Sequence, residues 1–158
     1  MRMVILSQDN KHMKGEKKIA TGINALVVNE KNGTVFCIKK ADTDEYFPGM
    51  YALPGGGLHT GESLEEAIQR EFTEETGYEL KNCSEIKIDV FVDLDTVVFH
   101  ALIVEGKLGK KITDKVDADI VDAQWVTVEE LLGSLAEHHY PESEIQKFRL
   151  YLRNKFKK

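Results

Sequence analysis

The feature that most constrains this chain is a glycine-rich run followed by an acidic helix, within residues 55–78. Ser63 and Glu66 have the spacing of a capping box, which predicts a helix that begins near Leu64. Gly77 is typical of the residue just past a helix C-terminus, because glycine adopts the left-handed conformation there without a steric cost. Because both ends of the helix are predicted, the helical period assigns each of its side chains to one face.

The inward face of this helix changes chemistry halfway along. Apolar side chains occupy the first half at helical spacing, and carboxylates continue the same stripe. In order, these positions are Leu64, Ala67, Ile68, Glu71, Glu74 and Glu75. At a separation of about 6 Å and an effective dielectric constant of about 20, each pair of carboxylates repels by roughly 3 kcal/mol. Arg70 cannot neutralise all of them, whereas a hard divalent cation bound by oxygen atoms can. The alternative is a solvated acidic face that binds no ion.

The composition limits the classes of protein to which this chain can belong. The chain has 158 residues, 42% hydrophobic and 30% charged, which is typical of one globular domain. The net charge of -6 argues against a general binder of nucleic-acid polymers or anionic membranes, because such proteins carry a basic excess. The N-terminal residues contain no apolar run long enough for a signal peptide or a membrane span, so we expect a cytoplasmic protein.

The remaining elements predict an α/β fold with a mixed β-sheet. An Asn-Gly turn between two β-branched runs predicts a hairpin, and a second hairpin is expected on either side of Leu94. Thr127 and Glu130 form a second capping box ahead of a helix. The predicted strands are 20–29, 34–39, 85–93, 95–104 and 121–126, the later helices are 128–137 and 144–156, and a short edge strand is possible within residues 1–7. The hairpins exclude a purely parallel sheet, and the order of elements favours helices on both faces.

The spacing around the acidic helix is similar to a known signature. It begins with a glycine, five residues of any type, a glutamate and seven more residues of any type. An arginine, a glutamate, an apolar residue and two further glutamates follow, and the signature ends with a glycine and an apolar residue. The matching positions are Gly56, Glu62, Arg70, Glu71, Phe72, Glu74, Glu75, Gly77 and Tyr78. This resembles the Nudix box of the Nudix hydrolase family, from which Tyr78 departs mildly because an aliphatic residue is usual there.

The resemblance implies a single domain over 1–158 with a Nudix-type α/β/α sandwich. It also implies Mg²⁺-dependent or Mn²⁺-dependent hydrolysis of a nucleoside diphosphate linked to another moiety. By the same resemblance, the metal ligands are Glu71, Glu74, Glu75 and the carbonyl of Gly55, and the catalytic set is these glutamates with Arg70, which orients them. Glu62 supports the loop, Glu71 is the general base in some relatives, and Gly56 lets the backbone approach substrate phosphates.

Residues outside the box are expected to complete the site. Many relatives supply another acidic ligand shortly before the last strand, for which Asp119 is our first choice and Asp117 and Asp122 follow. These residues can equally be solvated loop acids. Lys39 and Lys40 end a strand near the glycine run and are candidates for binding substrate phosphates, with surface lysines as the alternative.

The late loop offers an alternative general base. His138, His139 and Glu142 lie in such a loop, and an imidazole has a suitable pKa for this role. Exposed loop residues without a catalytic role are the alternative. His59, within the glycine-rich run, is a candidate for the edge of the site.

The box predicts chemistry and leaves the substrate open. The proline expected in ADP-ribose hydrolases is absent near Leu94, and the short chain favours a nucleoside triphosphate or a nucleotide sugar. The expected partner is thus a small nucleoside diphosphate derivative, with a homodimer possible by resemblance. The rival hypothesis is a nucleotide-binding sensor without turnover, although the intact carboxylates favour an enzyme.

Overall fold

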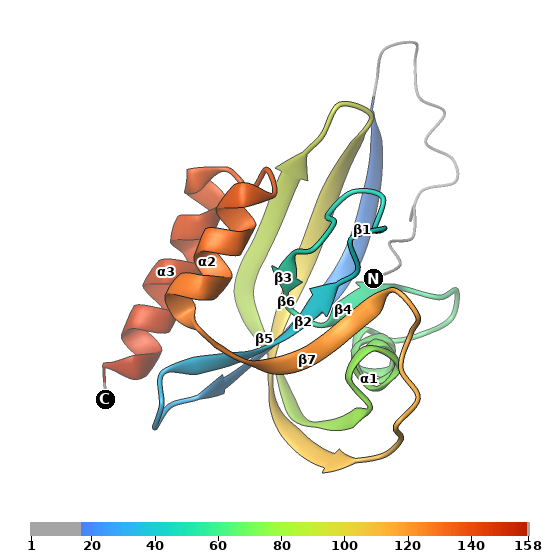
Figure 1. Cartoon of the computed structure of the whole chain (residues 1–158), viewed down its shortest axis with the longest axis vertical. Helices are drawn as coiled ribbons and strands as arrows, with labels where there is room; N and C mark the ends of the chain where they lie inside the picture. The colour runs from blue at the N-terminus through green and yellow to red at the C-terminus, as the bar shows by residue number, and fades with distance from the viewer. Residues whose placement is uncertain (1–16, 158) are drawn as a thin grey trace.

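The computed structural model describes residues 17–157 (Figure 1). The strands are β1 Lys18–Asn29, β2 Thr34–Lys40, β3 Tyr51–Ala52, β4 Gly55–Gly57, β5 Tyr78–Asp93, β6 Val97–Lys111 and β7 Ile120–Thr127. The helices are α1 Leu64–Thr76, α2 Val128–Glu137 and α3 Glu142–Phe156. The possible edge strand within residues 1–7 lies outside the described residues.

The described strands form one mixed sheet. Five of them follow the order β3-β2-β1-β6-β5, while β4 pairs with β1 and β7 pairs with β2. β1 runs parallel to β6, and the other pairs are antiparallel. The first predicted hairpin is confirmed: Gly33 has a φ of 66°, and the side chain of Asn29 accepts hydrogen bonds from the N–H groups of Lys31 and Asn32.

Helices cover both faces of this sheet, which confirms the predicted α/β/α sandwich (Figure 1). On one face, Ala67, Ile68 and Phe72 of α1 pack against β1 residues such as Ile23. On the other face, α2 and α3 bury a larger core. That core includes Leu131, Leu132, Leu135, Ile145, Phe148 and Leu152 together with Val35, Cys37, Val90 and Phe99. No helix among residues 17–157 is long and apolar enough to cross a membrane.

The second hairpin is longer than predicted. β5 begins at Tyr78, just after α1, rather than at residue 85, and β6 continues to Lys111 rather than ending at residue 104. A Cβ on Gly106 would lie 2.6 Å from Cδ1 of Leu80, so this glycine allows the two strands to pack closely. The polar residues of this hairpin alternate with buried ones and face solvent, which a strand pattern allows.

Two boundaries near the candidate site also differ from the prediction. The run Gly55–Gly57, expected as a loop, is the short strand β4, paired with Gly22–Asn24 of β1. Helix α3 begins at Glu142 rather than at residue 144, so Glu142 lies in the first helical turn and not in a loop. The strand β4 forms through pairing with β1, a contact between segments distant in the sequence. The earlier start of α3 follows from Pro141, because proline is favourable beside a helix N-terminus.

Candidate active site

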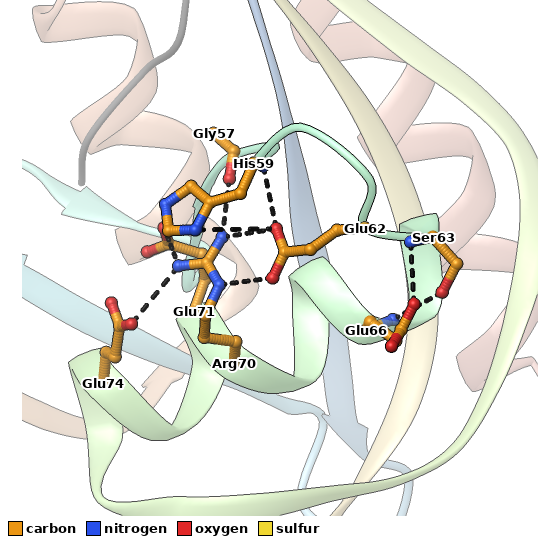
Figure 2. Close-up of polar contacts among 8 residues, drawn as sticks. All are labelled: Gly57, His59, Glu62, Ser63, Glu66, Arg70, Glu71 and Glu74. Carbon is orange, nitrogen blue, oxygen red and sulfur yellow. Dashed lines mark hydrogen bonds and ion pairs between the residues drawn. The ribbon is translucent and has the colours of Figure 1, made fainter.

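Helix α1 begins and ends where its capping signals predicted. The N–H of Glu66 donates to the hydroxyl oxygen of Ser63 at 3.1 Å, and the N–H of Ser63 donates to the carboxylate of Glu66 at 2.9 Å (Figure 2). At the other end, Gly77 has a φ of 81° and its N–H donates to the carbonyl of Thr73. These contacts define both ends of α1, and the packing of its apolar residues on β1 turns the carboxylate stripe toward β4.

Arg70 lies at the centre of a network of acidic groups (Figure 2). Its guanidinium donates to both carboxylate oxygens of Glu62, at 2.6 and 2.9 Å. The same group donates to Glu71 at 2.8 Å, to Glu74 at 3.2 Å and to the carbonyl oxygen of Gly57 at 3.0 Å. One planar cation thus joins the loop, the strand β4 and two successive turns of α1.

This network shifts the pKa values of Glu62 and Arg70 toward the charged forms. The hydrogen bonds from Arg70 lower the pKa of Glu62 to about 2. In turn, the hydrogen bond to Glu62 is the main reason why the pKa of Arg70 is raised above its usual value. Both groups therefore remain ionised at neutral pH, and Arg70 keeps its charge beside the acids of α1.

Gly56 makes room for the carboxylate of Glu71. Glu71 is buried, with a relative exposure of 1%. A Cβ added at Gly56 would lie 2.5 Å from the carboxylate carbon of Glu71, closer than any real contact of this kind. Only glycine at this position of β4 allows the helix to carry a buried carboxylate against the strand, which gives a physical reason for this glycine of the box.

Gly55 and Glu75 form a second strand-to-helix contact. The N–H of Gly55 donates to Oε1 of Glu75 at 2.7 Å. Glu75 is fully buried, and this burial raises its pKa to about 7, although the Gly55 N–H and the charge of Lys40 act in the opposite direction. A Cβ on Gly55 would lie 2.1 Å from the carbonyl oxygen of Ile23, so this glycine is required by the backbone of β1.

Three carboxylates come together in a geometry that can hold a metal ion. Glu71, Glu74 and Asp117 each place one oxygen within 4.8 Å of the others; we call them the three-carboxylate group. The backbone N–H of Asp117 donates to the carbonyl oxygen of Glu74 at 2.9 Å, which ties the loop before β7 to the end of α1. A purely oxygen donor set suits hard divalent cations such as Mg²⁺ and Mn²⁺.

The preferred loop residue of the sequence prediction lies nearby but outside this group. Asp119 follows Asp117 by two residues, and its carbonyl oxygen accepts a hydrogen bond from the N–H of Ala41 at 2.8 Å. Asp122 lies within β7, where its side chain accepts a hydrogen bond from the N–H of Ala123. Among the described residues, the carboxylates that converge in this way include Asp117 and neither Asp119 nor Glu75.

The two candidate lysines differ in environment. Lys40 is buried, with 1% exposure, and its ammonium lies 3.8 Å from Oδ1 of Asp44, so it is no ordinary surface lysine. Its charge also acts on Glu75, which places a cation on the side of the buried acids. Lys39 instead lies over the ring of Tyr51, 5.5 Å from the ring centroid.

The candidate bases of the late loop have different contacts. The ring nitrogens of His138 lie 2.7 Å from the carbonyl oxygen of Ser134 and 2.8 Å from that of Pro48, so this imidazole links α2 to the loop before β3. His139 is exposed and has a φ of 74°. The carboxylate of Glu142 is 70% exposed and lies 3.9 Å from the guanidinium of Arg149.

His59 and Asn24 complete the surroundings of the glycine strand. The N–H of His59 donates to Glu62 at 2.8 Å, and its ring lies beside the Arg70 network (Figure 2). Asn24 was not singled out from the sequence. Its buried side chain donates to the carbonyl oxygen of Leu53 at 2.8 Å and so holds the approach to β4. A single amide inside an otherwise apolar strand is the signal that could have found it.

The comparisons with known proteins agree with this geometry. A family model described as the NUDIX domain matches residues 18–146. Nucleoside triphosphatase NudI of Enterobacter sp. (strain 638) is 30% identical over 111 residues, which cover 65% of this chain and 79% of that protein. The protein of the same name from Escherichia coli O139:H28 is 45% identical over 51 residues, a span of only 36% of its length.

Solved structures show the same fold. The MutT protein from Methanosarcina mazei Go1 has a TM-score of 0.69 at 26% identity and covers 90% of this chain and 99% of its own. A NUDIX hydrolase from Nitrosomonas europaea, at 20% identity and a TM-score of 0.68, covers 85% of this chain and 89% of its own and supports the fold alone. The chain belongs to the Nudix hydrolase family. This confirms the family and the enzyme class predicted from the box, a Nudix-type pyrophosphohydrolase.

Proposed function

We propose that this protein uses Mg²⁺ to hydrolyse the diphosphate linkage of a small nucleotide, with a nucleoside triphosphate as the favoured substrate and a nucleotide sugar as the next choice. The observation that carries the proposal is the three-carboxylate group, in which Glu71, Glu74 and Asp117 converge beside β4. Relatives named nucleoside triphosphatases support the choice of a triphosphate.

The residues of this site fit a divalent cation. Their donors are oxygens, and Gly56 leaves space for the Glu71 carboxylate against the strand. A bound Mg²⁺, or Mn²⁺ in its place, would neutralise phosphate charge, stabilise the leaving oxygen and lower the pKa of a bound water. We propose Glu71, Glu74 and Asp117 as ligands. Glu75, Asp119 and the carbonyl of Gly55, predicted from the box and its surroundings, remain further candidates.

The protein's own groups would orient the reaction. Arg70 holds Glu71 and Glu74 in fixed directions through hydrogen bonds of 2.8 and 3.2 Å. We assign the general base to Glu71, whose buried carboxylate lies at the glycine strand. Lys40 offsets the charge of the buried acids, a role that its burial supports better than direct phosphate binding. Lys39 and Gly56 remain candidates for contact with the substrate phosphates.

The alternative bases of the late loop receive less support. Carbonyl oxygens can only accept hydrogen bonds, so a ring nitrogen of His138 that bonds to one of them does so as a donor and offers no lone pair to a water. Glu142 lies beside Arg149 on an exposed helical turn. His139 keeps an accessible ring and is the strongest of the three.

A substrate panel tests the proposal. The purified protein is assayed with Mg²⁺ and with Mn²⁺ against nucleoside triphosphates, nucleotide sugars, ADP-ribose, dinucleoside polyphosphates and coenzyme A, and products are separated by ion-exchange chromatography. Glu74→Gln is expected to fold normally and to lose turnover, while Glu65→Gln, on the exposed side of the same helix, is the matched control. Full turnover in Glu74→Gln would contradict the metal assignment, and tight nucleotide binding without turnover in the native protein would favour the sensor.

The assembly and extent of the protein remain predictions. We propose a single domain over residues 1–158, and a homodimer is the expected assembly. Light scattering at several concentrations measures the molar mass directly, and a mass equal to that of one chain would contradict the dimer.

A further inference from the structure

The sheet face that carries α1 continues beyond that helix. Ile23, Ala25 and Val27 of β1 lie under α1, and alternate residues of a strand share a face, so Thr21 and Ile19 belong to the same face. Ile19 is 44% exposed. Within residues 17–157, the α1 residues pack further along this face, and α3 contacts the region at the strand β5, where the N–H of Phe91 donates to the carboxylate of Glu144 at 2.7 Å.

An ordered aromatic patch occupies this region. Thr21, His100 and Phe91 lie in one row across β1, β6 and β5. The rings of Phe91 and His100 are stacked, with centroids 4.3 Å apart and planes 6° from parallel. Phe91 is 44% exposed, so one of the largest apolar side chains on this face is in contact with solvent. We call Thr21, Asp89, Phe91 and His100 the aromatic patch.

Polar neighbours hold the imidazole of the patch in place. Nε2 of His100 lies 3.1 Å from a carboxylate oxygen of Asp89, which can only accept, so Nε2 carries the hydrogen. Nδ1 lies 3.5 Å from the hydroxyl oxygen of Thr21, at the outer limit of a hydrogen bond. A ring held at both edges presents a flat, pre-ordered surface, which lowers the entropic cost of stacking a planar ligand.

The patch lies on the same face as the three-carboxylate group. Gly56 pairs with Ile23, and a side chain at Gly56 would point at Glu71, so this face of β4 and β1 also carries the carboxylates. Gly57 pairs with Gly22, whose neighbours across the sheet are Ala101 and Val90; the aromatic patch forms the adjacent row. This register links the two sites through continuous strand pairing.

The spacing between neighbouring strands gives an approximate distance from β4 to the residues of the aromatic patch. Strands lie about 4.8 Å apart, so His100 lies two spacings, about 10 Å, from β4, and Phe91 lies about 14 Å away. The carbonyl oxygen of Gly57 on β4 accepts a hydrogen bond from Arg70, which also holds Glu71 and Glu74. An extended nucleotide with its phosphates at the carboxylates can therefore place its base over the patch.

We propose that Phe91, stacked on His100, is the platform on which the nucleobase of the substrate stacks, with Asp89 and Thr21 as positioning residues for the imidazole. The proposal rests on the proposed function and specifies where that substrate binds. Exposed aromatic rings bind bases through their π-faces with little dependence on sequence, so the platform favours a nucleoside over a base-free polyphosphate.

Kinetics with and without a base test this assignment. Phe91→Ala is compared with the native protein on a nucleoside triphosphate and on inorganic tripolyphosphate, which has the same anhydride bonds but no base. KM for the nucleotide is expected to rise about tenfold with little change in kcat, because removing a ground-state stacking contact weakens binding uniformly. The kinetics with tripolyphosphate, as substrate or as competitive inhibitor, stay unchanged.

Two variants serve as controls. Phe91→Tyr keeps the ring and is expected to retain the native KM for the nucleotide. Leu150→Ala removes a more exposed apolar side chain, 55% exposed, from α3 on the other side of the sheet and is expected to change neither KM. Circular dichroism melting checks that each variant folds.

The outcomes separate the two proposals. If Phe91→Ala leaves the nucleotide KM unchanged, or raises the constants for nucleotide and tripolyphosphate alike, the base does not bind on the patch. If the native protein hydrolyses no phosphoanhydride, the proposed function fails. Calorimetry with a non-hydrolysable nucleoside triphosphate then tests separately whether the base binds on the aromatic patch. Nucleotide binding that is about tenfold weaker in Phe91→Ala than in the native protein supports stacking of the base on the patch. Equal binding in both proteins, or no binding in either, overturns it.

Discussion

The backbone N–H of Asp117 donates a 2.9 Å hydrogen bond to the carbonyl oxygen of Glu74. The last carbonyls of a helix have no partner within the helix, so this contact satisfies one of them and joins the loop before β7 to α1. It also places the side chains of the two residues beside each other and beside Glu71. One backbone contact thus brings an acid from a distant loop to the carboxylate stripe of the helix.

Asp117 and Asp119 can be separated by mutation. Asp117→Asn is expected to weaken Mn²⁺ binding at least about tenfold and to lower turnover accordingly, because an amide cannot replace the charge of a carboxylate in the group. Asp119→Asn is expected to have the smaller effect. Calorimetric titration with Mn²⁺ measures both variants, and a larger loss in Asp119→Asn would return the loop ligand to Asp119.

The neighbouring glycines of β4 are expected to fail in different ways when given a side chain. Gly55→Ala directs its Cβ at the backbone of Ile23, so we expect it to lower the free energy of unfolding by about 1–3 kcal/mol. Gly56→Ala directs its Cβ at the carboxylate of Glu71, so turnover should fall more than stability. Urea denaturation and steady-state kinetics on both variants compare the two losses; the opposite ranking would show that Gly56 serves only the fold.

Arg70→Lys tests the geometry of the guanidinium. Lysine keeps the charge but cannot donate from three separate nitrogens to Glu62, Glu71, Glu74 and the strand carbonyl at once. Turnover is expected to fall by at least about tenfold, with metal affinity reduced, because the directions of Glu71 and Glu74 are no longer held. Arg149→Lys, which changes a partly exposed arginine of α3, is the control. Native turnover in Arg70→Lys would show that the charge alone is sufficient.

The pair of Glu62 and Arg70 predicts a pH dependence of stability. The folded pKa of Glu62 is lowered from 4.5 to about 2, so the pair contributes its full stability above the unfolded pKa and loses it as the pH falls through about 2. The difference in the free energy of unfolding between the native protein and Glu62→Gln should thus be constant above about pH 5 and shrink toward pH 2. Urea denaturation from pH 7 to 2.5 measures it, and a difference that grows with acid would contradict the assignment.

His138 is expected to act on stability more than on chemistry. Its ring links the carbonyl oxygens of Ser134 and Pro48, so His138→Ala should lower the free energy of unfolding by about 1–2 kcal/mol and leave kcat near the native value. Thermal denaturation and kinetics measure both quantities, with His139→Ala as the neighbouring control. Loss of kcat in His138→Ala, with stability retained, would restore His138 as a candidate base.

Local patterns in the sequence determined the acidic helix. The capping box of Ser63 and Glu66 and the C-terminal Gly77 depend only on residues within a few positions of each other, and the structure has both. The helical period then places Glu71, Glu74 and Glu75 on one stripe without reference to the rest of the fold. The resemblance of these residues to the Nudix box implied the family and the sandwich architecture.

Only the tertiary structure decided which distant residues meet that helix. The burial of Lys40, the contact of Asp117 with Glu74 and the pairing of Gly55–Gly57 with β1 join segments far apart in the chain. The full length of β5 and β6 could likewise not be predicted from the sequence, because alternating polar residues resemble a loop until a partner strand pairs with them. Spacing along a helix is a property of the local backbone, whereas these contacts depend on how the sheet brings separate strands and loops to one face.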